Sequence, residues 1–127
     1  MITLEHQGTP IPQGRIRHTR YGTYYPPTSV AHRKELVEAF KADLAGYDTY
    51  TFPFEGEVEI DIFLAGPRVS SDLDNHAKQV LDALVETGVI KDDDCRTVVQ
   101  LRVRRQLRVP KKNRYTMVRV CPWERDG

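Results

Sequence analysis

Apolar and polar residues repeat along the chain with two different periods, one typical of strands and one typical of helices. Residues 57–64 alternate strictly, and the apolar side of this predicted half-buried strand carries Val58, Ile60, Ile62 and Leu64. Residues 97–107 alternate as well, with Val99, Leu101 and Val103 opposed by Gln100, Arg102 and Arg104. Shorter patterns predict a first strand over residues 1–7 and a return strand from Tyr115 to Cys121.

Two segments show the helical period instead. Ser29 is a suitable N-cap for a helix that runs to about Ala45 and ends at Gly46. The apolar residues of this helix fall on one face and comprise Leu36, Val37, Phe40 and Leu44. A second helix is predicted over about residues 73–87, with Gly88 placed to end it in a left-handed conformation. Its predicted buried stripe consists of Leu73, Ala77, Val80, Leu81 and Leu84.

The connecting segments complete the predicted fold. Residues 8–28 are rich in Gly, Pro, Tyr and Arg, which favours an ordered but irregular loop. Residues 110–114 have turn chemistry and predict a hairpin between the last two strands. We therefore expect an α+β fold, a small mixed β-sheet with two main helices packed on it. No linker or repeat divides the sequence, so residues 1–127 are predicted to form a single domain.

Composition narrows the class of protein without defining its function. The chain has 127 residues, of which 39% are hydrophobic and 29% charged, as in an ordinary globular domain. Only Cys95 and Cys121 are present, too few to stabilise a fold by disulfides, which favours free thiols in a reducing cytoplasm. No apolar run is long enough to cross a bilayer, and the first residues do not have the pattern of a secretory signal.

The net charge of +1 conceals an uneven distribution. One basic segment comprises Arg102, Arg104, Arg105, Arg108, Lys111, Lys112, Arg114 and Arg119, with no acid among them. A second basic group comprises Arg15, Arg17 and Arg20, with His18 beside them. The acids gather in the middle of the chain at Asp72, Asp74, Asp82, Glu86, Asp92, Asp93 and Asp94. This segregation suits an anionic polymer on the basic parts and a cation in the acidic part, although composition alone favours ordinary solvated charges.

The candidate chemistry lies at the start of the second predicted helix. Asp72 and Asp74 can direct both carboxylates at one point, and Asn75 follows them directly. Lys78 comes one turn after Asp74 on the same helix face, where its ammonium can contact a bound phosphate. Further acids follow at residues 92–94. Carboxylate oxygens are the ligands that Mg²⁺ prefers, and phosphodiester hydrolysis uses such an ion.

Simpler interpretations exist for the same residues. Asp72 and Asp74 are also favoured at a helix N-terminus as caps, and Lys78 could form an ordinary ion pair with Asp74 or Asp82. Other known sites are excluded, since an EF-hand would need Gly and Glu where the chain has Ala77 and Ala83. The four histidines lack zinc spacing, and the sequence contains neither a Gly-rich nucleotide motif nor a Ser-His-Asp arrangement.

The run from Asp72 to Leu84, followed by Gly88 and the acidic pair at 92–93, resembles the signature of RusA-type Holliday-junction resolvases. That pattern is Asp-x-Asp-Asn, a Lys three residues later, Asp-Ala-Leu, a Gly and an acidic pair. The early segment 10–17 also resembles many members. The resemblance implies a homodimeric endonuclease, carried by bacteria or phages, that nicks four-way junctions symmetrically with Mg²⁺, or with Mn²⁺ in its place, and without a nucleotide cofactor.

Carried over by position, the catalytic and metal-binding carboxylates would be Asp72, Asp74 and Asp93, with Lys78 as an essential basic residue. Spacing from Gly88 favours Asp93 as the third ligand, with Asp92 next. A helix of about 14 residues is roughly 20 Å long, so the third carboxylate begins far from Asp72. Either its segment folds back along the helix or it comes from the partner subunit, and the sequence leaves both open.

The predicted DNA-binding residues are basic and comprise Arg15, Arg17, Arg20, Lys78, Arg102 and Arg104. Within the loop, the aromatic ring of Tyr21 is available to stack on unpaired bases. Three alternatives remain: a branched-DNA-binding protein that does not cut, a hydrolase of small phosphate esters, and an interaction domain whose acids are only caps. The unbalanced basic segment favours a polymer as substrate.

Overall fold

The computed structural model describes residues 1–15, 17–94 and 96–123, and its elements follow the predicted order with three additions, the strands of a short hairpin and a short 3₁₀ helix. They are β1 (Ile2–Gln7), β2 (Arg17–Thr19), β3 (Gly22–Tyr24), α1 (Pro27–Leu44), β4 (Val58–Ala65), α2 (Leu73–Thr87), β5 (Val98–Gln106), the short 3₁₀ helix η1 (Lys111–Asn113) and β6 (Tyr115–Pro122). The main sheet has the order β1-β6-β4-β5, in which only β4 and β5 run parallel. The prediction of an α+β fold with a small mixed sheet is confirmed.

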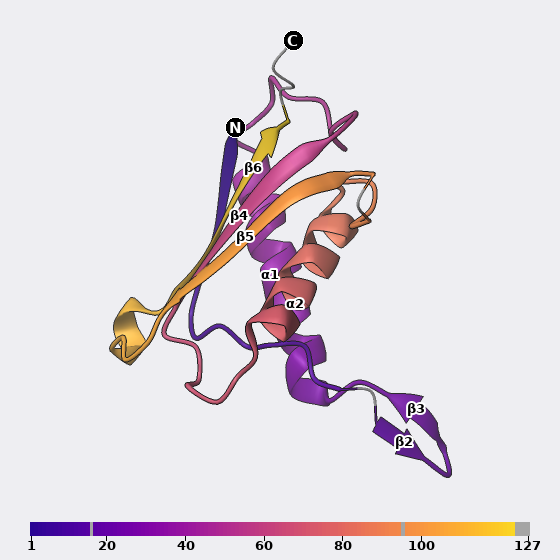
Figure 1. Ribbon diagram of the computed structural model, residues 1–127, viewed down its shortest axis with the longest axis vertical. Helices are drawn as coiled ribbons and strands as arrows, with labels where there is room; N and C mark the ends of the chain where they lie inside the picture. Colours follow the sequence, from indigo (N-terminus) through magenta and orange to yellow (C-terminus); the bar gives the residue numbers. More distant parts are fainter. Residues whose placement is uncertain (16, 95, 124–127) are drawn as a thin grey trace.

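Both helices lie on the same side of the sheet, and no helix in the described part of the chain covers the other side (Figure 1). Alternation in β4 produces this arrangement, because Val58, Ile60, Ile62 and Leu64 are all buried beneath the helices. Leu36 and Phe40 of α1 and Leu84 of α2 meet them from the helical layer; the core also includes Ile2, Leu4, Val118 and Val120. The hydrophobic core therefore fills the space between one face of the sheet and the two helices.

The ends of the elements place the candidate chemistry at one end of the molecule. Strands β4 and β5 finish at the end where α1 and α2 begin, and β2 and β3 project nearby (Figure 1). Met1 and the last residues of β6 lie at the opposite end (Figure 1). The second helix spans the predicted residues, and Gly88 ends it with a φ of 82°. The basic loops and the start of α2 thus share one end of the fold.

The first helix begins two residues before the predicted cap. Pro26 is the N-cap and Pro27 opens the helix, where a missing N–H does no harm. Ser29 is buried inside the first turn, and its hydroxyl donates to the Pro26 carbonyl oxygen at 3.0 Å. Prediction of Ser29 as the cap was wrong because two prolines already set the backbone for a helical start.

Two predicted apolar stripes are only partly buried. Leu73 at the start of α2 keeps 36% of its surface exposed, and Leu101 in β5 keeps 42%. Both face the space between α2 and β5, and β5 is an edge strand of the sheet. Periodicity identified the correct face of each element, but only the sheet order reveals that nothing in the described residues covers the edge.

Residues 8–28 are more regular than predicted. Strands β2 and β3 pair antiparallel and, with the connecting Arg20 and Tyr21, form an exposed hairpin that we call the arm (residues 17–24). The Thr19 hydroxyl donates to the Gly22 carbonyl oxygen at 3.2 Å, and Gly22 adopts a φ of 125°. The arm projects from the body beside the start of α1 (Figure 1). Local turn chemistry forms this hairpin although the segment carries little apolar periodicity.

The last two strands do not form the predicted hairpin. Strand β6 lies between β1 and β4, whereas β5 lies on the far side of β4. The connection through residues 107–114 must therefore cross the end of β4 instead of turning back on β5. Hydrophobic alternation identified both strands correctly but carries no information about which strands become neighbours.

A pair of histidines, the half-buried His6 and the buried His32, joins β1 to α1. The rings of His6 and His32 meet edge to face with centroids 5.2 Å apart, and Glu35 approaches both. Nε2 of His32 accepts the backbone N–H of Ile11 at 3.4 Å, so the ring is neutral there. Burial, together with nearby His6 and His76, lowers the pKa of His32 to about 4.

Cys121 is a half-buried free thiol, and Cys95 lies outside the described residues. Neither of the two helices in the described ranges is both long and apolar enough to span a membrane.

Candidate active site

Two carboxylates stand without partners at the start of α2. Asp72 is the N-cap residue in an extended conformation, yet its side chain makes no capping hydrogen bond. Asp74 lies in the first turn, where the helix dipole favours a negative charge. Both residues are exposed, and neither carboxylate forms an ion pair with any described residue. Helix capping therefore does not explain the carboxylate of Asp72, because this side chain accepts no hydrogen bond from the first turn of α2.

A groove of about 420 Å³ runs between α2 and β5. Its charged lining residues are Asp74, Lys78 and Asp93, and its apolar lining consists of Leu73, Ala77, Leu81, Leu101 and Val103. The segment after Gly88 returns far enough for Asp93 to line this groove, but the described residues contain no group of three acids at which Asp93 joins Asp72 and Asp74. Asp72 is not part of the lining. The structure thus brings together three of the four predicted catalytic residues.

The three successive acids at 92–94 differ in their surroundings. Asp94 accepts both side-chain and backbone hydrogen bonds from Arg96, which lower the pKa of its carboxyl. Asp92 accepts the backbone N–H of Asp93 at 2.7 Å. Asp93 alone of the three lines the groove, and local desolvation, the contact with Asp92 and the charge of Asp82 raise its pKa. A carboxyl with a raised pKa is one whose negative charge lacks nearby compensation.

The ammonium of Lys78 points into the same groove without an acidic partner. Within the described ranges, no carboxylate lies within ion-pair distance of it. Asp82, the alternative ion-pair partner predicted for Lys78, instead forms an ion pair with Arg33 at 3.5 Å. It also accepts a hydrogen bond from the side-chain amide of Gln13 at 3.1 Å. The positive charge of Lys78 is therefore available to a ligand.

These donors suit Mg²⁺ in kind but are incomplete in number. Mg²⁺ binds oxygen ligands and commonly uses one or two carboxylates with several waters, so Asp72 and Asp74 fit it chemically. Across the described residues, however, no group of three acidic, imidazole or thiol side chains lies close enough to hold an ion. A third protein ligand requires either a shift of the segment that carries Asp93 or a group from another chain.

Sequence reasoning missed the network that fixes the loop before the arm onto α2. Gln13 is only 5% exposed, and its backbone N–H donates to the Asn75 carbonyl oxygen at 3.1 Å. Gln79, also buried, donates a hydrogen bond to the Ser29 carbonyl oxygen at 2.7 Å. Its side-chain oxygen accepts one from the guanidinium of Arg33 at 3.2 Å. The sequence signal that could have revealed this network is Gln79, a polar residue at a core position of α2. The network holds the base of the arm beside the first turn of α2.

The predicted DNA-binding residues occupy three separate surfaces. Arg15 is exposed next to the arm, and Arg17 and Arg20 lie on it; the guanidinium of Arg20 stacks 4.9 Å from the ring centre of Tyr21, which is 85% exposed. Lys78 lies in the groove. Arg102 and Arg104 lie on the uncovered face of the sheet, opposite the helices.

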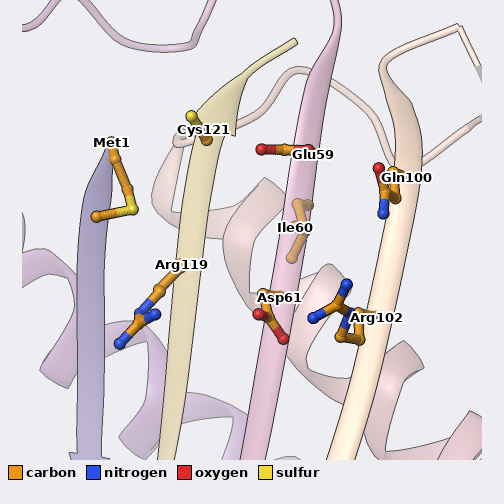
Figure 2. Close-up of a pocket in the computed structure, with 8 residues that line it drawn as sticks. All are labelled: Met1, Glu59, Ile60, Asp61, Gln100, Arg102, Arg119 and Cys121. Atoms are coloured by element: carbon orange, nitrogen blue, oxygen red, sulfur yellow. The ribbon is translucent and has the colours of Figure 1, made fainter.

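Figure 2 shows that uncovered face, with the helices behind the strands. Arg102 lies beside Asp61 in the register of the sheet, and Arg104 donates to Asp61 at 3.2 Å. Acids and bases alternate across this surface, so it is less positive than the sequence of β5 alone suggested. The structure does not bring Arg102 and Arg104 together with the groove.

Comparison with known proteins identifies the class of this one. The family model described as endodeoxyribonuclease RusA matches residues 7–120, which is most of the chain. The chain therefore belongs to the RusA family of endodeoxyribonucleases, nucleases that act on Holliday junctions. No curated protein matches it significantly.

Proposed function

We propose that this chain is a Mg²⁺-dependent, structure-selective endodeoxyribonuclease that resolves four-way DNA junctions by symmetric paired nicks. The observation that carries the proposal is that the unpartnered carboxylate of Asp74 and the unpartnered ammonium of Lys78 line one groove, with the unpartnered Asp72 two residues before Asp74. Neither Asp74 nor Lys78 forms an ion pair with another described residue of the fold. Membership of a nuclease family supports a role for them in phosphodiester cleavage.

In this proposal, some of the site residues would hold a metal ion and others would contact the DNA. Asp72, Asp74 and Asp93 would hold Mg²⁺, or Mn²⁺ in its place, through carboxylate oxygens. The bound ion would supply charge neutralisation at the scissile phosphate, a nucleophilic hydroxide and stabilisation of the leaving oxygen. Lys78 would contact a non-bridging phosphate oxygen and orient the phosphate beside the carboxylates. The apolar walls of the groove would limit water around these charges and strengthen their interactions.

A homodimer is part of this proposal. A four-way junction has two-fold symmetry, and symmetric nicks need two active sites related by a two-fold axis. The incomplete set of carboxylates in one chain and the exposed Leu73 and Leu101 beside it support a second copy at the groove. Such a copy would cover apolar surface and could provide the missing ligand.

The alternative function is a protein that binds branched DNA without cutting it. The basic arm would serve either function. Unpartnered carboxylates beside Lys78 argue against the alternative, because acids near a phosphate weaken DNA binding unless a cation lies between them. A protein selected only for binding would gain nothing from Asp72 and Asp74.

The test is a cleavage assay on a synthetic mobile four-way junction with Mg²⁺, beside linear duplex of the same sequence. We expect paired nicks in the junction alone, and none when the ion is chelated. Sedimentation of the free protein gives its oligomeric state in the same preparation. Tight junction binding without nicking in Mg²⁺ or Mn²⁺ would support the alternative, and a lack of both binding and nicking would contradict both functions.

The arm is expected to supply junction affinity. Replacing both Arg17 and Arg20 with Gln should weaken binding to the junction by roughly tenfold at 0.1 M salt and reduce the slope of log affinity against log salt by about 1 to 2, since each lost phosphate contact lowers the slope by ~0.9. Fluorescence anisotropy in EDTA measures both. Thermal stability should not change, because both side chains are exposed. An unchanged slope would show that the arm does not contact the backbone.

A further inference from the structure

We propose that a second DNA phosphate, distinct from the scissile one, binds in a pocket formed by Arg68, Arg108 and Arg114, which we call the arginine pocket. It has a volume of about 200 Å³ and lies where the chain crosses the end of β4. The identity of the ligand as DNA rests on the proposed function. The pocket itself rests on geometry and charge that are independent of the groove between α2 and β5.

The path of the chain builds the pocket from three separate segments. Gly66 and Arg68 follow β4, Arg108 and Arg114 belong to the connection that crosses it, and Thr9 follows β1. Backbone hydrogen bonds lock these segments together: Gly66 donates to the Gln106 carbonyl oxygen at 2.8 Å, and Gly8 donates to the Arg114 carbonyl oxygen at 2.9 Å. The pocket is a consequence of β6 inserting between β1 and β4, and its walls are held by main-chain contacts.

Three arginines line this pocket together without an acid. None of its lining residues, all from the described part of the chain, is Asp or Glu. The guanidinium groups of Arg68 and Arg108 make neither a hydrogen bond nor an ion pair with any described residue. Like charges gathered in this way repel one another, and an anion in the pocket would remove that repulsion. Elsewhere in the described ranges, Arg33, Arg96 and Arg104 each have a carboxylate partner.

Arg114 is fixed in place before any ligand arrives. Its Nε donates to the Val109 carbonyl oxygen at 2.9 Å, and one terminal nitrogen donates to the Thr9 hydroxyl at 3.3 Å. The side chain lies across Gly66, where an added Cβ would come within 2.5 Å of the Arg114 Cγ. A glycine with a φ of 80° therefore provides the space that this arginine occupies. A preorganised guanidinium loses little freedom on binding a phosphate oxygen.

The backbone at Arg108 is also unusual. Its φ is 59°, and it is the one residue other than glycine in the described ranges with a positive φ. Glycine or asparagine adopts this conformation at less strain than arginine. An arginine held in a strained conformation at the edge of a pocket indicates that its side chain is needed there.

The pocket is connected to the candidate active site by a short, constrained loop. Arg68 precedes Asp72 by four residues, a span of at most ~14 Å. The Arg68 carbonyl oxygen accepts the backbone N–H and the hydroxyl of Ser71, at 3.0 and 2.6 Å. Ser71 in turn contacts His76 of α2 at 2.8 Å and Arg105 of β5 at 3.2 Å. A phosphate in the pocket is therefore held at a fixed distance from the carboxylates.

Size and chemistry favour a backbone phosphate as the ligand. The pocket is smaller than the roughly 300–1,000 Å³ typical of small-molecule sites, and it offers guanidinium groups and a hydroxyl but no aromatic ring. DNA strands carry a charge about every 3.4 Å along the axis, so a Cα–Cα span of ~14 Å, extended by the two side chains, corresponds to a phosphate several nucleotides from the cut. Contacts of this kind fix the register of a protein on DNA. The arginine pocket would thus set where the nick falls relative to the crossover.

The test compares two doubly substituted proteins that lose the same charge. Arg68→Gln with Arg108→Gln alters the arginine pocket, and Lys34→Gln with Lys41→Gln alters exposed residues of α1 outside it. We expect the first to weaken junction binding in EDTA by about tenfold, to lower the salt slope by ~0.9 to 1.8, and to spread the nick over neighbouring positions. The control should change affinity less than twofold. Junction nicking by the wild type, with both variants behaving alike, would overturn the inference while leaving the proposed function intact.

A second measurement does not depend on junction activity. Titration of inorganic phosphate should shift the NMR signal of the Arg114 Nε–H in the wild type and in the control, but not in the pocket variant. A shift with phosphate, but no difference between the variants on DNA, would mean that the pocket takes free phosphate and would overturn the assignment to DNA. If phosphate does not shift this signal in the wild type, the pocket does not bind phosphate and the inference is wrong. If phosphate shifts the signal but the protein neither binds nor nicks junctions, only the proposed function is contradicted.

Discussion

Replacing Asp74 with Asn is expected to abolish junction nicking almost completely while leaving the fold intact. Asn is nearly the same size as Asp but has no negative charge, so it is a poor ligand for Mg²⁺. Charge stabilisation by the ion is worth several kcal/mol in the transition state, which corresponds to a rate loss of roughly 100- to 1,000-fold. Asp74 is exposed and has no ion-pair partner among the described residues, so its loss should not destabilise α2 by more than about 1 kcal/mol.

Binding distinguishes this result from a general loss of function. Removing a negative charge near the scissile phosphate should leave junction affinity in EDTA unchanged or slightly higher. Asp48→Asn is the matched control, because Asp48 is exposed in the turn after α1, far along the chain from the groove. Single-turnover nicking and anisotropy should be measured on both variants. Nicking by Asp74→Asn within tenfold of the wild-type rate would mean that the groove is not the active site.

Acidification is expected to destabilise the fold through buried histidines. The pKa of His32 is lowered from 6.5 to about 4 in the folded protein, chiefly by burial. Between these values the unfolded chain binds a proton that the folded chain does not, so stability is complete above pH 6.5 and is lost as pH falls towards 4. His32 alone should lower the free energy of unfolding by about 2 kcal/mol between pH 7.5 and pH 5, and by about 3 kcal/mol at lower pH. The lowered pKa values of His6 and His76 act in the same direction.

Urea unfolding at pH 7.5 and pH 5 measures this effect. His32→Gln should be less sensitive to pH than the wild type, since Gln does not titrate. His18→Gln is the matched control, because His18 lies on the exposed arm, away from the core that holds His32. Equal stability of the wild type at the two pH values, or an unaltered pH dependence in His32→Gln, would contradict the assignment of a buried neutral ring.

The fold class and most element boundaries could be predicted from local patterns. Helix α2 and strand β4 are found where periodicity places them, because each buries one face against the same core. Gly88 ends α2 as expected, since a left-handed residue is needed at that position and glycine adopts it readily. The candidate carboxylates could also be identified from the sequence, because Asp72 and Asp74 belong to a short contiguous motif.

Local pattern failed where the structure depends on neighbours distant in sequence. Turn chemistry at residues 110–114 predicted a hairpin, yet β5 and β6 are separated by β4. A strand's own alternation determines which face is buried, but the pairing partner depends on how all four strands share the core. Similarly, Arg102 and Arg104 belong to the same basic segment of the sequence as Arg114, but they lie on the uncovered face of the sheet, where Arg104 pairs with Asp61.

By itself, the sequence determined the α+β class, the helix that carries the acidic motif and the basic character of the arm, because these depend on contacts between residues close in the chain. Only the tertiary structure decided that Lys78 and Asp93 face one groove and that no third carboxylate joins Asp72 and Asp74 within the described chain. It also decided that Arg68, Arg108 and Arg114 meet at the end of β4. The physical reason is that strand order, which local periodicity does not specify, sets which charged side chains become neighbours.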